Sequence, residues 1–440
     1  MSKIHVGVAR VCITPPIGTA MSGYFYPRYS KGILDDLYAT AVAFDDGKKR
    51  AIVISLDLCG LKNQWWCDEC LRNISEFCKI PSDAVIISCT HTHTGPVVGP
   101  EAESGAENNR LYDAYLMTKV RDVAYLALQN MAPAKFYTAS GECKDIAFVR
   151  LFRMKDGSVR TNPGRGNPDV VAPISKPYEE LTLLKMEREN EKDIFIVNYG
   201  VHACVVGGTQ ISADFPGVLR NAIEEAVPNS ICVFLQGAEG DLNHVDVKVT
   251  EAQKGPSHAQ FMGKRLAEIV LSICNDAEEV KADDIHVASR RIEIPANKEN
   301  DKLEEAKRIL SFYRSGKEDE EAMQCAGAKQ ITSIPEAHRI AELSDGPDAL
   351  SFRISAVSVG NVAFAALPGE PFCKIGENII KSSPFLKTMI CVLSDGGEVY
   401  FPTSNLYDEN AYEVTSSFVK KGADEILTTE MLRLLEDIKK

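Results

Sequence analysis

Apolar positions along the chain follow two different periods. Short runs rich in β-branched residues at 6–11, 39–44 and 50–56 predict strands, and the turn signal at 45–47 predicts a hairpin between the last two. From 109 to 130, apolar residues recur at helical spacing, which predicts a helix. Further strands are expected at 84–89, 181–186, 194–199, 231–235, 352–359, 362–367 and 388–393, and further helices at 218–227, 258–275, 372–381 and 422–440. This alternation predicts an α/β fold in which mixed β-sheets are flanked by helices.

Two stretches of the chain share one order of elements. The first is the hairpin at 39–56, followed by a helix and a strand that ends at His91; the second is the strand pair at 352–367, followed by a helix and a strand that ends near Asp395. This echo suggests two related βαβ halves that face one site, and chance similarity is the alternative. Residues 1–440 are expected to form one domain with a charged helical insertion at about 300–345. The Pro- and Gly-rich stretch at 156–177 predicts a long loop.

Two histidines stand at the end of a predicted strand. The sequence Thr-His-Thr-His at 90–93 follows the apolar run at 84–89, and a Gly-Pro pair at 95–96 predicts a turn after it. Because alternate residues of a strand point to the same face, His91 and His93 are expected on one side and the two threonines on the other. Imidazole binds first-row metals and exchanges protons near neutral pH. A metal or catalytic site and a buried, hydrogen-bonded strand end are both compatible with this spacing.

Polar side chains also follow three other predicted strands. His202 comes after the strand at 194–199, Glu239 and Asp241 after that at 231–235, and Glu370 after that at 362–367. Ligands of α/β sheets bind beyond the carboxyl ends of strands, so these segments can converge. Two or three histidines with a carboxylate suit zinc, and they leave one position open for water.

Composition narrows the class of partner. Hydrophobic residues make up 45% and charged residues 25% of the 440 residues, as in an ordinary globular protein. The net charge of −13 argues against nucleic acid as the main partner, so a small-molecule substrate is expected. No window approaches the roughly 18 apolar residues of a membrane span, and the polar start lacks the apolar core of a signal peptide. The oligomeric state is left open.

Thirteen cysteines are scattered from Cys12 to Cys391. Without a secretory signal, free thiols and a cytoplasmic location are expected. Cys67 and Cys70 form a C-x-x-C pair, which could hold a structural zinc ion. They lie in a helix-like segment with no second pair at zinc-finger spacing, so a structural role as buried thiols is the favoured interpretation.

Six segments in order resemble the catalytic domain of the neutral/alkaline non-lysosomal ceramidase family, which are zinc-dependent amidases. They are Ile13-Thr14-Pro15-Pro16-Ile17-Gly18, the histidine segment at 90–96, Val201-His202, Gly240-Asp241, Leu367-Pro368-Gly369-Glu370, and Tyr400-Phe401-Pro402-Thr403 followed by Ala411-Tyr412-Glu413. These segments span nearly the whole chain, and the ordered set is more specific than any one of them. The resemblance implies a zinc-binding amidase domain.

The resemblance also implies a set of zinc ligands. Position by position, these are His91, His202, Glu370 and Tyr400. Taken alone, Glu370 could instead cap the helix that follows it, and Tyr400 could be a core aromatic residue in a strand. Agreement of all four positions with the family favours the metal.

Catalytic roles are implied in the same way. His93 corresponds to a residue beside the metal that helps catalysis, Tyr412 to an active-site tyrosine that donates to a developing oxyanion, and Arg150 to a substrate-facing arginine. The residues around Arg150 match poorly, and an ordinary surface cation on a strand is the alternative. His93 or Asp241 is expected to accept the proton of the attacking water, and His244 could replace His93 in that role.

The chain also departs from the family. Ceramidases carry a nucleophilic serine in a G-D-x-S-P motif, and this chain has Asn243 at that position. An extra C-terminal immunoglobulin-like domain and a secretion signal are not found in this sequence either, so ceramide itself is a doubtful substrate. We therefore expect a zinc-dependent hydrolase that attacks an amide or related acyl bond of a small soluble substrate with activated water. A zinc-dependent lactone or ester hydrolase, or a lyase or isomerase, is the first alternative, and a non-catalytic binding protein on the same fold is the second.

Overall fold

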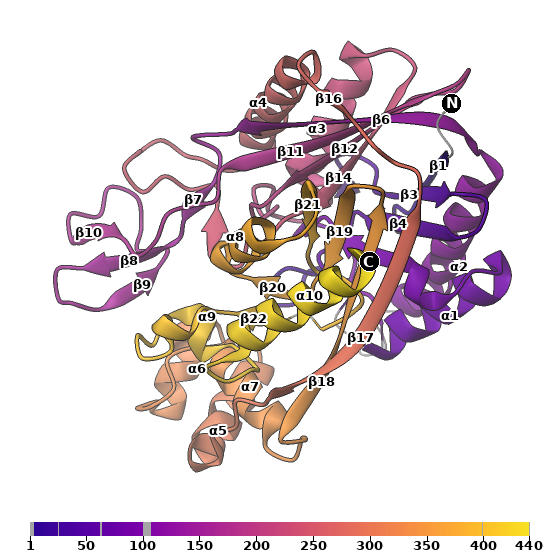
Figure 1. Cartoon of the computed structure of the whole chain (residues 1–440). Coiled ribbons are helices and arrows are strands. Elements are labelled where there is room, and N and C mark those ends of the chain that lie inside the picture. The colour runs from indigo at the N-terminus through magenta and orange to yellow at the C-terminus, as the bar shows by residue number, and fades with distance from the viewer. Residues whose placement is uncertain (1–3, 25, 62–63, 100–106, 398, 440) are drawn as a thin grey trace.

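The computed structural model describes residues 4–24, 26–61, 64–99, 107–397 and 399–439 (Figure 1). The first three residues of the expected polar start and the last residue of the expected C-terminal helix lie outside the described part. Within it, mixed sheets are flanked by helices, which confirms the α/β fold expected from the sequence. None of the helices in these ranges is long and apolar enough to cross a membrane.

The larger sheet has nine strands. Its order is β14-β12-β11-β6-β1-β3-β4-β5, and β16 pairs with β6 outside this path. The strands are β1 (His5–Cys12), β3 (Tyr38–Asp45), β4 (Arg50–Leu56), β5 (Val85–Cys89), β6 (Ala132–Glu142), β11 (Glu180–Arg188), β12 (Asp193–Tyr199), β14 (Ser230–Gln236) and β16 (Glu278–Val280). Strand β5 runs parallel to β4, and β14 runs parallel to β12. Both β5 and β14 are buried along their full length, which explains their nearly continuous apolar sequences.

A second sheet packs against the first. It contains β17 (Ile285–Pro295), β18 (Ala349–Val359), β19 (Val362–Ala366) and β21 (Lys387–Cys391), in that order. The core between the sheets is built from alternate residues of their strands. The ring centroid of Phe44 lies 6.4 Å from that of Phe136, which is also in the larger sheet. It lies 5.9 Å from the ring centroid of Phe364 in the second sheet. The period of two in these strands therefore sets which side chains join the two sheets.

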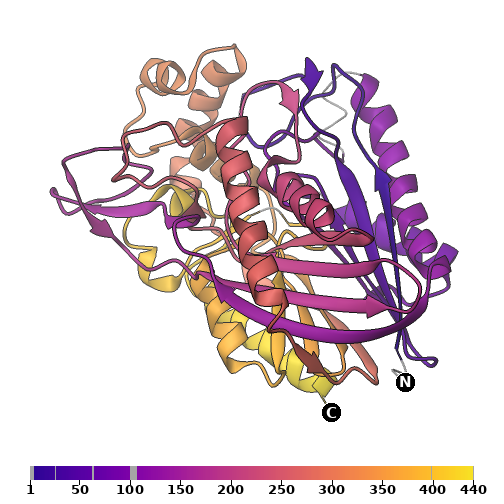
Figure 2. The same cartoon turned by 90° about the horizontal axis from the view of Figure 1, so that it is seen from above.

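Helices cover the outer faces of both sheets (Figure 2). Helices α1 (Gln64–Cys78) and α2 (Glu107–Gln129) pack together, and α2 lies on β1 and β3. Helices α3 (Asp214–Ala226) and α4 (Pro256–Cys274) pack together over β14 and β6. Helices α8 (Cys373–Ser382) and α10 (Ala423–Lys439) cover the second sheet. Each of these helices packs one apolar face against a sheet and exposes its opposite face.

One supersecondary unit occurs three times. Unit 1 is the β3–β4 hairpin, α1 and β5; unit 2 is the β11–β12 hairpin, α3 and β14; unit 3 is the β18–β19 hairpin, α8 and β21. In each unit the last strand pairs in parallel with the second strand of the hairpin. Units 1 and 3 are the two related halves expected from the sequence, and unit 2 is a third copy that the sequence echo did not reveal.

The last strands of the three units meet at their carboxyl ends. Ser88 of β5 forms an isolated antiparallel bridge with Ser394, just after β21. The Val392 amide donates to the carbonyl of Gln236, the last residue of β14, at 3.0 Å. The loops that leave these strands are therefore brought to one place.

A buried acid at a strand end of each unit contacts another unit. Asp57, after β4, makes a two-point ion pair with Arg220 of α3, with N···O distances of 2.7 and 2.6 Å. Asp241, after β14, accepts from the first backbone amide of α8 at 2.7 Å. Asp395, after β21, accepts from the Ile87 amide of β5 at 3.3 Å. These contacts fix the loops that carry the candidate site residues.

The charged segment near 300–345 is helical, as expected. It contains α5 (Leu303–Arg314), α6 (Asp319–Ala326) and α7 (Ile334–Leu343), which lie between β17 and β18. These helices share a small core of their own, separate from the core between the sheets. The helical segment is interrupted between α6 and α7, and Pro335 lies in the first turn of α7, where a missing amide costs nothing.

The expected long loop at 156–177 is partly ordered into strands. Strands β9 (Val159–Thr161) and β10 (Val170–Pro173) flank β8 (Leu151–Met154) in a small antiparallel sheet. Gly157, Gly164 and Gly166 have positive φ angles, so the glycines that suggested a loop supply its tight turns. The remaining short strands are β2 (Gly32–Ile33), β7 (Phe148–Val149), β13 (Gln210–Ile211), β15 (Leu242–Asn243), β20 (Glu370–Pro371) and β22 (Tyr400–Phe401), and α9 spans Tyr412–Thr415.

Candidate metal centre

His91 and His93 follow β5 with their rings side by side. Strand β5 ends at Cys89, and His91 has a φ of +69°, so the strand alternation used in the sequence analysis does not extend to it. The two rings nevertheless meet edge to face, with an interplanar angle of 86° and their Nε2 atoms 3.2 Å apart. Thr90 and Thr92 point away, and their hydroxyls donate to Asp57 and to the Ser212 carbonyl. The two histidines therefore lie on one side and the two threonines on the other, as expected. The backbone that places them has a left-handed conformation at His91 and is not a continuous strand.

Two imidazoles are oriented by backbone carbonyls. The His91 Nδ1–H donates to the carbonyl of Cys59 at 2.7 Å, and the His202 Nδ1–H donates to the carbonyl of Glu239 at 3.0 Å. A proton on Nδ1 leaves the Nε2 lone pair available to a metal ion. Both rings are almost fully buried. This is the usual way in which a protein fixes the tautomer of a histidine ligand.

Glu370 lies between these two histidines. Its Oε2 atom is 3.4 Å from His91 Nε2 and 3.0 Å from His202 Nε2. Electron pairs of three side chains therefore point at one place, and such a close approach needs a shared cation, either a proton or a metal ion. The side chain of Glu370 does not cap α8, because the cap position is Phe372 and Asp241 accepts from the first amide of that helix.

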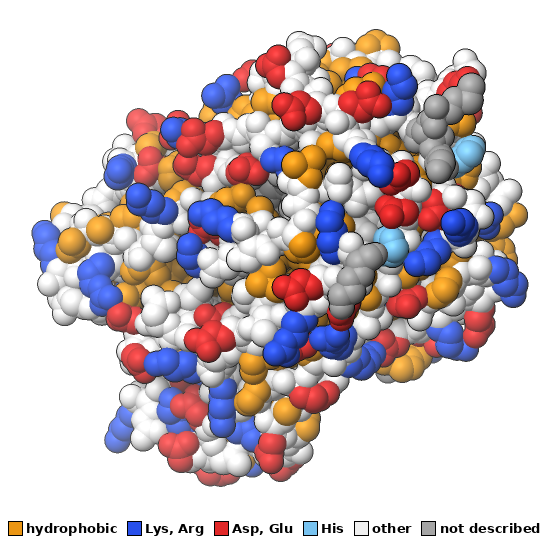
Figure 3. All heavy atoms as spheres, in the orientation of Figure 1, with side chains coloured by type: hydrophobic (Ala, Val, Ile, Leu, Met, Phe, Trp, Pro, Cys, Tyr) orange, Lys and Arg blue, Asp and Glu red, His pale blue; other side chains and the backbone are white. Residues whose placement is uncertain are grey.

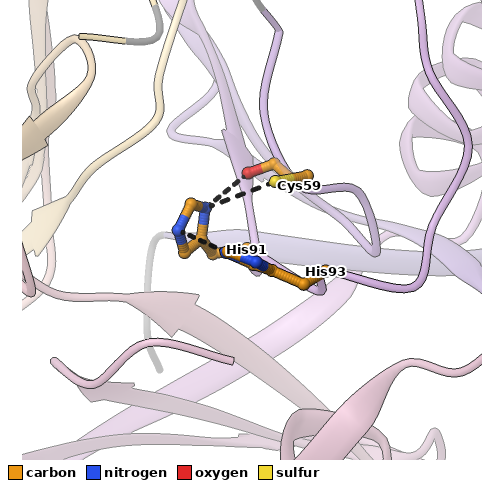
Figure 4. A group of neighbouring side chains, drawn as sticks. All are labelled: Cys59, His91 and His93. Atoms are coloured by element: carbon orange, nitrogen blue, oxygen red, sulfur yellow. Dashed lines mark hydrogen bonds between the residues drawn. The ribbon is translucent and has the colours of Figure 1, made fainter. Parts of the chain in front are cut away.

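Two groups of described residues could hold a metal ion. The first is His91, His202, Glu239 and Glu370, whose candidate ligand atoms all lie within 4.8 Å of one another. The second is Cys59, His91 and His93 (Figure 4). In the second group His91 would have to use Nδ1 toward Cys59, yet Nδ1 is already engaged by the Cys59 carbonyl, while the sulfur is 3.9 Å away. The first group therefore fits a metal ion better, and neither group includes Cys67 or Cys70, which are buried in α1.

Electrostatics at this cluster reflect burial and mutual contact. Burial alone would raise the pKa of Glu370, but His91 and His202 hold it well below its usual range. Burial would likewise lower the pKa of His91, but the Glu370 carboxylate raises it well above its usual value. Burial and Arg150 lower the pKa of His202 to about 4. A proton at the His91–Glu370 contact occupies the place that a metal ion would take, so metal binding there releases a proton.

Arg150 is buried beside the cluster, so the alternative of a surface cation is excluded. Its Nη1 atom lies 3.2 Å from His202 Nε2, and its Nη2–H donates to the Gly240 carbonyl at 2.6 Å. Its Nε forms an ion pair of 2.6 Å with Glu413 Oε1. Glu413 is fully buried and also accepts from the Thr161 hydroxyl at 2.6 Å. Glu413 follows Tyr412 in the motif at 411–413, and its pairing with Arg150 is not predictable from sequence alone.

Tyr400 lies beside Glu370, and Tyr412 lies beside Tyr400. Strands β20 and β22 run parallel, and Tyr400 is the register partner of Glu370. The Arg150 guanidinium lies over the Tyr400 ring, 5.2 Å from its centroid, and the ring of Tyr412 is 5.9 Å from that of Tyr400. Burial and the Glu370 carboxylate raise the pKa of Tyr400 well above its usual value. All four ligand positions implied by the family resemblance are thus in one neighbourhood.

The residues after β14 divide into two roles that sequence could not separate. Asp241 turns toward α8, where its two oxygens accept from the amide and the thiol of Cys373. Glu239 instead belongs to the group that could hold a metal.

Asn243, in place of the family's serine, donates to the Asn162 side chain at 2.6 Å and accepts from the Val245 amide at 2.9 Å.

His244 is buried outside the cluster. Its Nδ1 atom is 3.9 Å from the Cys204 sulfur, and its ring is 5.7 Å from that of His258. Burial and His258 lower its pKa to about 4. His244 therefore stays neutral in the folded protein, and it is not a member of either group that could bind a metal.

Replacing His244 with Gln is expected to flatten the acid dependence of stability. Between pH 6.5 and 4, His244 is protonated in the unfolded chain but remains neutral in the folded chain. The free energy of unfolding therefore falls as the pH falls through this window. The contribution of this residue is up to about 3 kcal/mol. Urea unfolding at pH 7 and pH 4 measures it, and a difference between wild type and variant that is independent of pH would refute the assignment.

Gly240 is packed against the backbone of Glu370. A Cβ atom at this position would lie 2.3 Å from the Glu370 carbonyl oxygen, which cannot rotate away. We expect Gly240→Ala to cost about 1–3 kcal/mol of unfolding free energy and to weaken metal binding. Gly346→Ala is the matched control, because the nearest atom to its added Cβ is at 3.5 Å. Equal effects of the two variants in urea unfolding would contradict the prediction.

Comparison with known proteins is consistent with this architecture. No family model matches the sequence. The fold is similar to the crystal structure of neutral ceramidase from Pseudomonas aeruginosa, with a TM-score of 0.75 and 16% sequence identity, over 99% of this chain and 75% of that chain. It is also similar to a ceramidase complexed with C2, with a TM-score of 0.76 and 15% identity over the same shares. The chain therefore has a ceramidase-like fold, as the sequence motifs had suggested.

Proposed function

We propose that this protein is a zinc-dependent hydrolase of an amide or related acyl bond in a small substrate. The observation that carries the proposal is the convergence of His91 Nε2, His202 Nε2 and Glu370 Oε2 inside a ceramidase-like fold. With Tyr400 beside them, these residues would hold the ion. A zinc ion in such a site polarises a carbonyl group and lowers the pKa of water from about 15.7 toward ~7, which makes water a competent nucleophile near neutral pH.

His93 is the proposed proton acceptor. It lies against His91 but is less buried than His91 and His202, so its ring borders the cluster rather than completing it. Asp241 is a weaker choice for this role, because both of its oxygens are engaged at the start of α8. A positioned acid or base of this kind contributes about 10²–10⁴ to the rate.

Tyr412 and Arg150 complete the proposed machinery. The hydroxyl of Tyr412 is proposed to donate to the oxyanion that develops on the substrate carbonyl. Arg150 is already engaged by Glu413 and by the Gly240 carbonyl, so we assign it mainly the positioning of Tyr400 and of the 237–241 loop. Its positive charge also favours an anionic transition state.

Asn243 supports direct attack by water. An amide side chain cannot serve as the nucleophile, and Asn243 is held by hydrogen bonds on both its donor and its acceptor side. Without an acyl-enzyme step, esters and lactones remain possible substrates for the same machinery. The described cysteines form no disulfide bonds, which fits the proposed cytoplasmic location.

A matched substrate panel tests the proposal. Zinc-loaded and metal-stripped protein would be incubated with N-acyl amides, esters and lactones that share one acyl group, and with hydroxy acids, and products would be identified by mass spectrometry. We expect amide cleavage that depends on zinc, with one oxygen atom from labelled water in the released acid. Faster turnover of the lactones or esters would move the assignment to that class, and equal activity with and without zinc would reject a metal-dependent reaction.

A further inference from the structure

Glu239 is a buried carboxylate for which the proposed zinc site has no role. It follows β14 in unit 2, and its side chain is fully buried. Neither of its carboxylate oxygens accepts a hydrogen bond from another described residue. Burial of a carboxylate without hydrogen bonds costs several kcal/mol unless a cation compensates it. The structure therefore contains a buried carboxyl group that can be ionised only beside a positive partner.

The side chain of Glu239 is directed at the metal cluster. One of its oxygens lies within 4.8 Å of ligand atoms of His91, His202 and Glu370. Its backbone carbonyl accepts the Nδ1–H of His202 at 3.0 Å, so the loop that places the carboxylate also orients a histidine of the cluster. Rotation of this loop would move both groups together.

Nearby cations of the protein do not account for Glu239. Arg150 is the buried cation beside the cluster, and its ion-pair partner is Glu413. Glu239 appears in no ion pair within the described ranges, whereas Asp57, Glu413 and Asp395 each have a buried arginine. Glu239 differs from these acids because its carboxylate lies among the candidate ligand atoms of the metal site.

We propose that Glu239 is an additional ligand of the divalent ion, so that the centre has two histidines and two carboxylates in addition to Tyr400. This inference rests on the metal centre of the proposed function but not on the reaction. Two carboxylates neutralise a divalent ion, and they make the set of ligands richer in oxygen than the set implied by family resemblance. Oxygen ligands suit Mn²⁺ better than nitrogen ligands do. The centre is therefore expected to bind Mn²⁺ as well as Zn²⁺.

Metal titration of Glu239→Gln tests this role. Affinities for Zn²⁺ and for Mn²⁺ would be measured by competition with a chromophoric chelator, on wild type, Glu239→Gln and the control Glu336→Gln, and folding would be checked by circular dichroism. Glutamine keeps the size of the side chain and removes its charge. We expect Glu239→Gln to lose at least about tenfold in affinity, more for Mn²⁺ than for Zn²⁺, because loss of a ligand exceeds the loss of a ligand's hydrogen-bond partner. Glu336→Gln removes the charge of a buried glutamate in α7, outside both groups that could hold a metal, and should bind both ions as wild type does.

Wild-type crystals loaded with Zn²⁺ give a second measurement that does not depend on the variants. We expect an oxygen of Glu239 at about 2.0–2.2 Å from the ion. Unchanged affinities of Glu239→Gln, or a Glu239 oxygen beyond ligand distance, would overturn the role of Glu239 and leave the centre intact. A wild-type protein that binds neither ion would overturn both the centre and this inference.

Discussion

Replacing His202 with alanine is expected to reduce zinc affinity by more than ~100-fold, since removal of a ligand should exceed the 10–100-fold cost of removing a ligand's hydrogen-bond partner. His202 is held by the Glu239 carbonyl on one side and lies 3.0 Å from Glu370 on the other, so its Nε2 atom is fixed at the position of the proposed ion. Activity on the preferred substrate should fall with metal content. Zinc occupancy after dialysis and turnover with added zinc measure the two effects.

His91→Ala should behave in the same way, because it removes the other nitrogen of the cluster. His286→Ala is the control, since His286 lies on β17 far from the cluster and is paired with Asp284. Full zinc occupancy and unchanged activity in both His91→Ala and His202→Ala would refute the assignment of these residues as metal ligands. A loss of fold in either variant would be detected by circular dichroism before metal analysis.

Asp57→Ala is expected to destabilise the protein by about 3–5 kcal/mol, because it leaves the buried Arg220 guanidinium without its partner. Asp57 is 1% exposed and accepts from both terminal nitrogens of Arg220, and it also accepts from the Tyr38 amide. The pair joins the end of β4 in unit 1 to α3 in unit 2, next to Thr90 and thus to the histidine segment. Urea unfolding of the metal-free protein measures the loss.

Asp45→Ala is the matched control for Asp57→Ala. Asp45 pairs with Arg50 at 2.7 Å, but the arginine is 53% exposed, so this pair contributes only about 0–1 kcal/mol. If the Asp57 and Asp45 variants lost the same stability, burial of the Arg220 pair would not matter. The double variant Asp57→Ala with Arg220→Met should recover part of the loss, because no unpaired charge remains.

Local pattern predicted most of the secondary structure of the site. Strands that end before 91, 202 and 370 were visible as apolar runs, and the rule that ligands bind beyond strand ends brought the three residues together. The exact backbone of the histidine segment was not visible, because a positive φ at His91 is a property of the turn and not of residue type. The alternation of side chains along a strand predicted that both imidazoles lie on one side. His91 is not in a strand conformation, so this alternation does not explain its orientation.

Contacts between distant residues were the part that sequence could not supply. Glu239 and Asp241 are two residues apart with the same charge, and only the packed structure shows that one turns to the cluster and the other to α8. The partner of Arg150, Glu413, lies more than 250 residues away and reaches it through α9. The family resemblance supplied Tyr400 as a candidate, and the structure adds its register with Glu370.

The three repeated units impose an order on how the centre can be assembled during translation. His91 leaves the ribosome with unit 1, His202 with unit 2, and Glu370 only with unit 3. A nascent chain that ends before unit 3 presents imidazoles but lacks the carboxylate that lies between them. Such a chain lacks one ligand of the metal ion. Tight binding of the ion would therefore begin only after unit 3 has packed against units 1 and 2.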